Sequence, residues 1–116
     1  MKRGEVWVGN LDANRGAELG KIRPVLVIQE EALGPEVTET VVVLPLTVQV
    51  REKVRHLRVT LPARDRLRRE CQVLVDQPRT LDRRRIGDGP LTRLTAEEMA
   101  VVERTLKAVL GLTETG

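Results

Sequence analysis

The sequence predicts a mainly β fold, a small barrel or sandwich of short antiparallel strands with an α-helix at the C-terminal end. Short runs of Val, Leu and Ile alternate with turn-forming residues, and no helix-length segment lies between them to cross over into a parallel sheet. One amphipathic pattern of helical period follows at the end. At 116 residues the chain has room for a single domain, residues 1–116, with one modest core.

The first strand is expected at Glu5–Gly9, with Val6 and Val8 on one face and Trp7 on the other. The next segment, Leu11–Lys21, is rich in Asp, Asn and Gly, a composition that predicts a long loop. Long ordered loops between strands are often functional, so this segment is a candidate part of a site.

Two buried strands follow. Pro24–Gln29 is a continuous apolar run, which predicts a strand covered on both faces. Residues 30–39 are interrupted by Gly34-Pro35 and are expected to form a connection. Thr40–Leu46, which is apolar from Val41 onwards, predicts a second buried strand.

The second half of the chain has three further strand candidates, Val54–Leu61, Glu70–Asp76 and Arg79–Leu81. The first alternates, and its inward residues are expected to be Leu57, Val59 and Leu61. The second alternates as well, and its residues on one face are Cys71, Val73 and Val75. Arg79–Leu81 is expected to be the last, short strand.

The C-terminal helix has clear start and stop signals. Thr95 and Glu98 have the spacing of a capping box, in which each side chain bonds the other residue's backbone N–H. The apolar residues that follow at helical spacing are Met99, Val102, Leu106 and Val109. Gly111 ends the helix. We expect this stripe to pack against the barrel as core.

Charge is unevenly distributed along the chain. The net charge is +3, but residues 51–93 hold 13 basic and 6 acidic residues, whereas the rest holds 7 basic and 11 acidic. A basic middle suits a polyanion, most simply RNA. The excess of Arg, 16 to 4 over Lys, is equally consistent with genome composition or surface ion pairs. With one Trp and no Phe or Tyr, an aromatic base-stacking platform is excluded.

Cysteine content and hydropathy restrict the setting. The lone Cys71 allows no intrachain disulfide and no thiolate metal site, which favours a reducing compartment. No apolar run approaches the ~20 residues of a membrane span, and the N-terminus lacks a signal-peptide core. We therefore expect a soluble cytoplasmic protein with no membrane partner.

Most ordinary catalytic machinery is missing from the sequence. There is no zinc-protease or phosphate-loop motif, and the nearest carboxylate pair, Asp76 and Asp82, is separated by Pro78. His56 lies between arginines and is interpreted as a surface residue. Cys71 is interpreted as a small core residue rather than a nucleophile.

The remaining polar candidates are Arg23, Thr47, Asp76, Gln77 and Arg79. RNA can be cleaved without metal, because its own 2′-hydroxyl attacks the adjacent phosphorus. The protein then needs to align the attack, stabilise the phosphorane and handle two protons. Because the pKa of arginine lies above ~12, Arg23 suits charge stabilisation rather than base catalysis. The alternative for Arg23 is a structural salt bridge, for example with Glu18 or Asp76.

Three segments together resemble the MazF/PemK-like toxins of bacterial toxin–antitoxin systems. They are Gly4-Glu-Val-Trp7 with the Leu11–Lys21 loop and Arg23-Pro-Val-Leu-Val-Ile28, then Pro45-Leu-Thr47, then Asp76-Gln-Pro-Arg-Thr80 followed by Leu81-Asp82. The resemblance follows nearly the whole chain in order, and it is specific as a set rather than segment by segment.

The resemblance implies an SH3-like barrel with a C-terminal helix, a homodimer and no cofactor. It implies sequence-selective cleavage of single-stranded mRNA to a 2′,3′-cyclic phosphate and a 5′-hydroxyl. It makes Arg23 the acid–base or phosphate-stabilising residue and Thr47 the hydroxyl that stabilises the transition state. Substrate-binding residues carried over from it are Glu18, Lys21, Asp76, Gln77, Arg79 and Thr80.

The partner implied by the resemblance is an acidic antitoxin tail that competes with RNA, and the Arg83–Arg85 cluster is a candidate contact for it. The sequence departs from one branch of the family, which has a histidine in the first loop and an arginine at the position of Leu74. The mechanism should therefore follow the Arg/Thr branch. Two alternatives stay open: a non-enzymatic toxin of this fold that binds gyrase, and an SH3-like binding module without catalysis.

Overall fold

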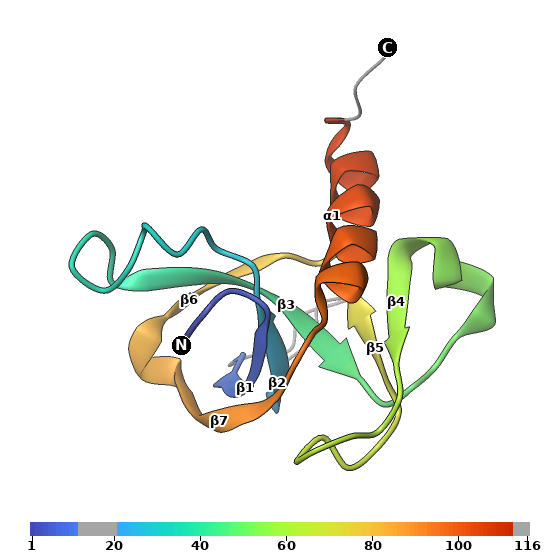
Figure 1. Cartoon of the computed structure of the whole chain (residues 1–116), viewed down its shortest axis with the longest axis horizontal. Helices are drawn as coiled ribbons and strands as arrows, with labels where there is room; N and C mark the ends of the chain where they lie inside the picture. The colour runs from blue at the N-terminus through green and yellow to red at the C-terminus, as the bar shows by residue number, and fades with distance from the viewer. Residues whose placement is uncertain (12–20, 113–116) are drawn as a thin grey trace.

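The computed structural model describes residues 1–11 and 21–112 (Figure 1). Its strands are β1 (Glu5–Asn10), β2 (Ile22–Val27), β3 (Thr40–Thr47), β4 (Arg58–Leu61), β5 (Cys71–Leu74), β6 (Arg79–Asp82) and β7 (Ile86–Arg93). Two 3-10 helices, η1 (Glu52–Leu57) and η2 (Arg83–Arg85), precede β4 and β7, and the α-helix α1 (Ala96–Leu110) follows β7. The predicted mainly β fold with a C-terminal helix is confirmed.

All seven strands belong to one antiparallel sheet with the order β4-β5-β3-β2-β1-β7, and β6 also pairs with β3. The long strand β3 joins the two halves of the sheet. Its first part, Thr40–Val43, pairs with β6, and its end, Leu46 and Thr47, pairs with β5. The sheet therefore bends along β3, and β6, η2 and β7 curl round to the far side of β1 (Figure 1).

Apolar side chains fill both faces of this sheet. One cluster joins β1–β5 to α1 and includes Leu26, Leu44, Val73 and Val102. The other lies inside the curled half and includes Val25, Val27, Val43 and Leu81, with Trp7 packed against it. Because neighbouring residues of β2 and β3 point to opposite faces, both strands are covered on both sides, as their continuous apolar runs predict.

Two strand predictions are wrong in detail. Residues 54–57 form part of the 3-10 helix η1, so only Arg58–Leu61 of the predicted Val54–Leu61 strand is extended. Arg79–Leu81 is part of β6 but is not the last strand, because the eight-residue β7 follows it. Strand β7 contains Gly87, Gly89 and Pro90, which in sequence are typical of a turn.

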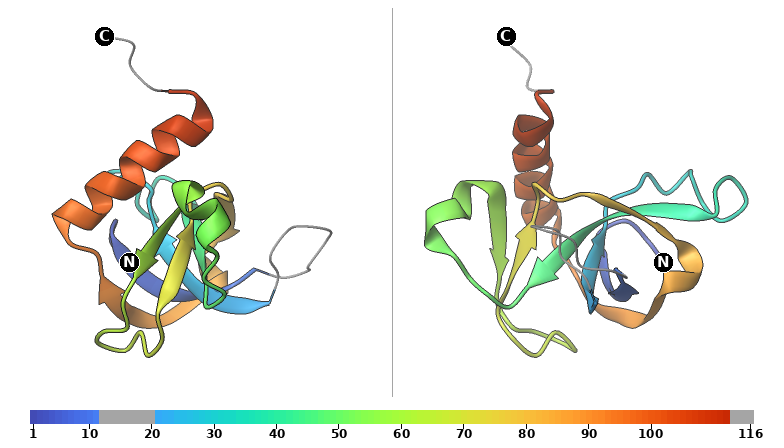
Figure 2. Two further views of the ribbon diagram at one scale, coloured as in Figure 1. Left: turned by 90° about the vertical axis from the view of Figure 1, so that its right-hand side faces the viewer. Right: turned by 180° about the vertical axis from the view of Figure 1, so that it is seen from behind.

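Helix α1 begins and ends where the sequence predicts. Thr95 and Glu98 form both bonds of the capping box, and Gly111 has the left-handed φ of 71°. Its first turns bury Met99 and Val102, whereas the rest projects away from the sheet (Figures 1 and 2). Among the described residues, no helix combines the length and apolar character needed to cross a membrane.

Candidate active site

Arg23 and Thr47 lie at the same end of the neighbouring strands β2 and β3. The ladder between these strands pairs Val25 with Pro45, and continuing that register by two residues aligns Arg23 with Thr47. Each residue is two positions from a member of the Val25–Pro45 pair, so the two side chains share a face of the sheet. Strand order and register thus place Arg23 and Thr47, which are 24 positions apart in sequence, at the same end of two neighbouring strands.

The Thr47 side chain has a defined orientation. The residue is 7% exposed, and its Oγ1 accepts a hydrogen bond of 3.1 Å from the backbone N–H of Gln49. A hydroxyl that already accepts a bond still has its own hydrogen to donate. Thr47 is therefore held as a hydrogen-bond donor at the end of β3, next to the position of Arg23.

Sequence reasoning missed the buried residue beside this pair. Gln72 of β5 lies directly opposite Thr47 in the β3–β5 ladder and is 0% exposed. Its Oε1 accepts from the Arg51 N–H at 3.0 Å and from Arg58 Nη1 at 3.3 Å, and its Nε2 donates to Thr60 Oγ1 at 3.3 Å. The polar residues Arg23, Thr47, Gln72 and Thr60 thus follow one line across four strands.

Arg79 holds the base of the predicted site loop. Its Nη2 donates to the Leu11 carbonyl at 2.9 Å, while the Leu11 N–H donates to the Lys21 carbonyl at 2.9 Å. Arg79 pairs with Val43 across β6 and β3, which puts it on the same face as Thr47. Lys21 is exposed and has a left-handed φ of 68°. Glu18 and most of the predicted loop lie outside the described residues.

The other predicted substrate residues are more dispersed. Asp76 is exposed in the turn after β5, where the Gln77 N–H donates to the Leu74 carbonyl at 3.1 Å. Thr80 pairs with Val42, so its side chain is on the opposite face of β6 from Arg79. The structure therefore groups Arg23, Thr47 and Arg79 on one face and leaves Thr80 on the other.

The surroundings of the two remaining titratable candidates, His56 and Cys71, indicate structural rather than catalytic roles. His56 is exposed in η1 rather than on an outward strand face. Burial raises the pKa of the Cys71 thiol, whose Sγ donates to the Arg69 carbonyl at 3.3 Å, so a thiolate is disfavoured there. Within residues 1–11 and 21–112, no three His, Cys, Asp or Glu side chains converge to hold a metal.

Arg83 and Arg84 of η2 have different hydrogen-bond partners. Arg83 donates to the Thr38 and Leu33 carbonyls, each at 2.9 Å, and so ties down the 30–39 connection. Arg84 contacts both carboxylate oxygens of Asp82 at 3.0 Å. The side-chain and backbone hydrogen bonds from Arg84 lower the pKa of Asp82 to about 2.

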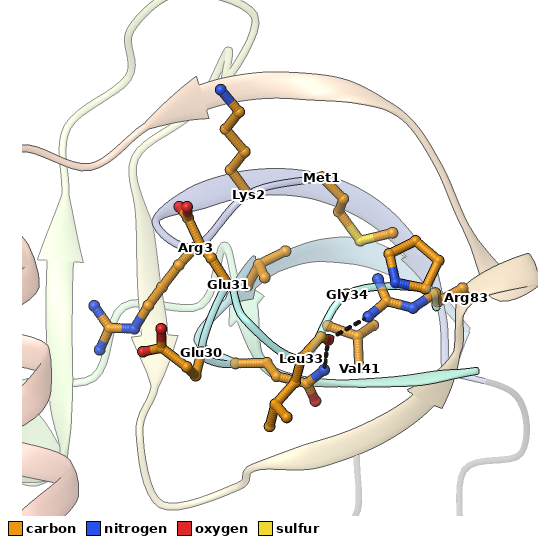
Figure 3. Close-up of a pocket in the computed structure, with 12 residues that line it drawn as sticks. Met1, Lys2, Arg3, Glu30, Glu31, Leu33, Gly34, Val41 and Arg83 are labelled. Atoms are coloured by element: carbon orange, nitrogen blue, oxygen red, sulfur yellow. Dashed lines mark hydrogen bonds between the residues drawn. The ribbon is translucent and has the colours of Figure 1, made fainter. Parts of the chain in front are cut away.

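A cavity of about 170 Å³ lies at the opposite end of β2 and β3 from the Arg23–Thr47 pair. Figure 3 shows Arg83, Leu33 and Glu30 around it, with Lys2 and Arg3 from the N-terminal segment on its far side. None of the residues predicted for the site lines this cavity. Residues in its wall, such as Arg83 and Leu33, form hydrogen bonds that hold the 30–39 connection in place.

The Arg23–Thr47 end of the sheet has the groups that phosphate chemistry needs. It combines an arginine with an oriented hydroxyl donor and a second arginine, Arg79, on the same face. Guanidinium and hydroxyl donors stabilise negative charge on phosphate oxygens. This arrangement can bind a phosphodiester and stabilise a pentacoordinate phosphorane without a metal ion.

Comparisons with known proteins point in the same direction. Residues 2–110 match the family described as PemK-like, MazF-like toxin of type II toxin-antitoxin system. Endoribonuclease EndoA of Bacillus subtilis is 34% identical over 113 residues, which are 97% of this chain and 96% of that protein. MazF of Deinococcus radiodurans superposes with a TM-score of 0.80 at 30% identity over 96% of each chain.

A mycobacterial endoribonuclease, solved in complex with its cognate antitoxin, is also similar. It superposes with a TM-score of 0.76 at 26% identity over 97% of each chain. Each of these matches covers 96–97% of this chain and of the relative.

Proposed function

Since this chain belongs to the PemK-like, MazF-like toxins of type II toxin–antitoxin systems, we propose that it is an endoribonuclease that cleaves single-stranded RNA without a metal ion. The observation that carries this proposal is that Arg23 and Thr47 each lie two residues beyond the last β2–β3 pair, Val25–Pro45, at the same end of the two strands. The similarity to Endoribonuclease EndoA of Bacillus subtilis also supports it.

The ribose 2′-hydroxyl attacks the adjacent phosphorus and loses its proton to solvent water. The bond from phosphorus to the 5′-oxygen breaks, which leaves a 2′,3′-cyclic phosphate and a 5′-hydroxyl. Arg23 neutralises charge on the phosphorane and is the proton donor to the leaving 5′-oxygen. Thr47 donates a hydrogen bond to a non-bridging oxygen, a role that suits its acceptance of the Gln49 N–H.

The residues around the pair form the substrate groove. Arg79 is a phosphate-facing candidate that also fixes the Leu11 end of the loop. Asp76, Gln77 and Lys21 would contact the substrate from the turn after β5 and the loop end. Glu18 and Thr80 belong to the same proposal, Thr80 with the least support because it lies on the other face of β6.

The partners in this proposal are a second copy of the chain and an acidic antitoxin. The mycobacterial relative is described with a cognate antitoxin, and MazE–MazF complexes of Deinococcus radiodurans have TM-scores of 0.76 and 0.75 with this chain. We place the protein in the cytoplasm, where mRNA is accessible to it.

The experiment is to incubate the purified protein with a transcript in the presence of EDTA and to sequence the new ends. We expect cleavage at recurrent sites, with 5′-hydroxyl and 2′,3′-cyclic phosphate ends. Uncut RNA, or cleavage that EDTA abolishes, would contradict the proposal. A gyrase supercoiling assay separates the non-enzymatic alternative, for which we expect no inhibition.

A further inference from the structure

We propose that the β3–β4 connection, residues 48–57, is a phosphate-binding flank of the active site, and that Gln72 is the positioning residue that holds it. This inference rests on the ribonuclease function proposed above. It assigns an RNA-backbone contact to a segment that contains none of the predicted site residues. It also gives a role to the fully buried Gln72.

The connection presents a concentrated positive charge to solvent. Arg51, Lys53 and Arg55 are exposed, and the acidic residue among 48–57 is Glu52. Glu52 lies 3.8 Å from Arg55, but both side chains are nearly 80% exposed, so water and salt screen their attraction. The segment therefore remains positive. Its backbone lies beside β4 (Figure 1).

Buried polar contacts hold this exposed segment in place. The Gln72 amide oxygen accepts a hydrogen bond from the Arg51 backbone N–H, which ties the connection to β5. The Gln49 N–H is bonded to Thr47 at the start of the segment, and η1 at its end packs on β4 and α1. A buried amide whose oxygen and nitrogen are both hydrogen-bonded makes such a connection rigid, because breaking these bonds would leave buried groups unpaired.

Arg58, at the end of the connection, adds a charge whose hydrogen-bond acceptors are neutral. Its Nη1 donates to Gln72 Oε1 at 3.3 Å and to the Gln49 carbonyl at 3.5 Å. Its Nε is buried and has no hydrogen-bond partner among residues 1–11 and 21–112. A partly enclosed cation is screened less than an exposed one, so Arg58 strengthens the positive potential beneath the segment.

Position favours RNA over an acidic protein as the occupant. The connection starts at the residue after Thr47, and the residue that holds it lies directly across the ladder from Thr47. An RNA strand whose scissile phosphate is at Thr47 has further phosphates on either side. On this side, Arg51, Lys53 and Arg55 of the connection follow Thr47 within eight residues.

The test measures how salt affects binding of a single-stranded 2′-O-methyl RNA, which lacks the nucleophile and so cannot be cut. In single strands each neutralised phosphate adds about 0.7 to the slope of log K against log salt. We expect Arg51→Ala, Lys53→Ala and Arg55→Ala together to reduce the slope by at least about 0.7. Arg104→Ala, an exposed arginine of α1, is the matched control and should leave the slope unchanged.

Steady-state cleavage provides a second readout. Loss of a flanking phosphate contact weakens substrate and transition state alike, so KM should rise while kcat stays constant. An unchanged salt slope and KM in the triple variant would overturn the inference. So would a variant that binds RNA normally but loses binding to a poly-glutamate peptide, because the segment would then serve a protein partner.

Two variants of Gln72 test the positioning role. Gln72→Leu removes the acceptor for Arg51 and should lower the salt slope as the loop variants do, whereas Gln72→Asn keeps a neutral amide acceptor and should restore part of the slope. A wild-type slope in folded Gln72→Leu would overturn this part. Where Gln72→Leu fails to fold, the loop variants still decide the phosphate contact. Absence of RNA cleavage by the unaltered chain is a separate result, which refutes the ribonuclease function itself.

Discussion

Arg64 and Arg58 occupy two ends of the β4–β5 region, and their partners differ in charge. Arg64 contacts both carboxylate oxygens of Glu98 at 2.7 Å and also bonds Thr92 Oγ1 at 3.3 Å. Arg58 instead bonds the neutral oxygens of Gln72 and Gln49. Glu98 neutralises Arg64, and this arginine connects β7 to α1 and stabilises the fold. The partners of Arg58 are neutral, so its positive charge remains to attract an anion.

The largest effect should come from the Arg23–Thr47 end of the sheet. We expect Arg23→Ala and Thr47→Ala each to lower kcat for RNA cleavage by about 10²–10³-fold, the usual cost of removing a transition-state donor. The thermal unfolding midpoint of Arg23→Ala should change little, and the loss of cleavage could then not be attributed to unfolding. Full cleavage by both variants would refute the assignment of these residues.

The Arg64–Glu98 clasp should show the reverse pattern. Arg64→Ala removes two charge-assisted hydrogen bonds from side chains that are 22% and 24% exposed. We expect the free energy of unfolding to fall by about 2 kcal/mol. Cleavage measured well below the unfolding temperature should keep its wild-type kcat. A variant that is as stable as the wild type but inactive would reverse the comparison.

The clasp should also make stability depend on pH. The hydrogen bonds from Arg64 lower the pKa of Glu98 from 4.5 to about 2. A lowered folded-state pKa stabilises the protein above pH 4.5, and this contribution is lost as the pH falls from about 4.5 towards 2. In urea unfolding at neutral pH, the free energy of unfolding of Glu98→Gln should therefore be about 2 kcal/mol below that of the wild type. This difference should become smaller in acid.

The smallest effect is expected for Arg84, an arginine that is paired with a carboxylate in full solvent. Its side chain is 91% exposed and contacts Asp82 at 3.0 Å. Because exposed ion pairs contribute little, Arg84→Ala should leave the unfolding midpoint unchanged within error. A shift as large as that of Arg64→Ala would show that pairing, rather than burial, decides stability here.

The local elements were largely predictable because their signals lie in neighbouring residues. The capping box of Thr95 and Glu98 and the left-handed Gly111 place α1 by themselves. The apolar run of Pro24–Gln29 predicts a strand with two covered faces, which the two clusters confirm. These signals act within one turn or one strand, so they need no knowledge of the rest of the chain.

Strand β7 could not be predicted in this way. Its Gly87, Gly89 and Pro90 indicate a turn, yet Gly89 is required because the Trp7 ring occupies the space of a side chain. A Cβ at Gly89 would lie 2.6 Å from Trp7 Cδ2. The glycine therefore marks a close approach between β1 and β7, which depends on a residue more than 80 positions away.

The candidate site divides in the same manner. The sequence by itself determined the residue types: an arginine before a buried strand, a threonine at the end of another, and no metal-ligand motif. Only the tertiary structure decided that pairing of β2 with β3 aligns Arg23 with Thr47, and that Gln72 is buried beside them. A glutamine in a short strand carries no sign of burial, because burial depends on the connection that folds over it. The chemical groups of the site follow from the residue types in the sequence, whereas their placement relative to one another depends on strand register.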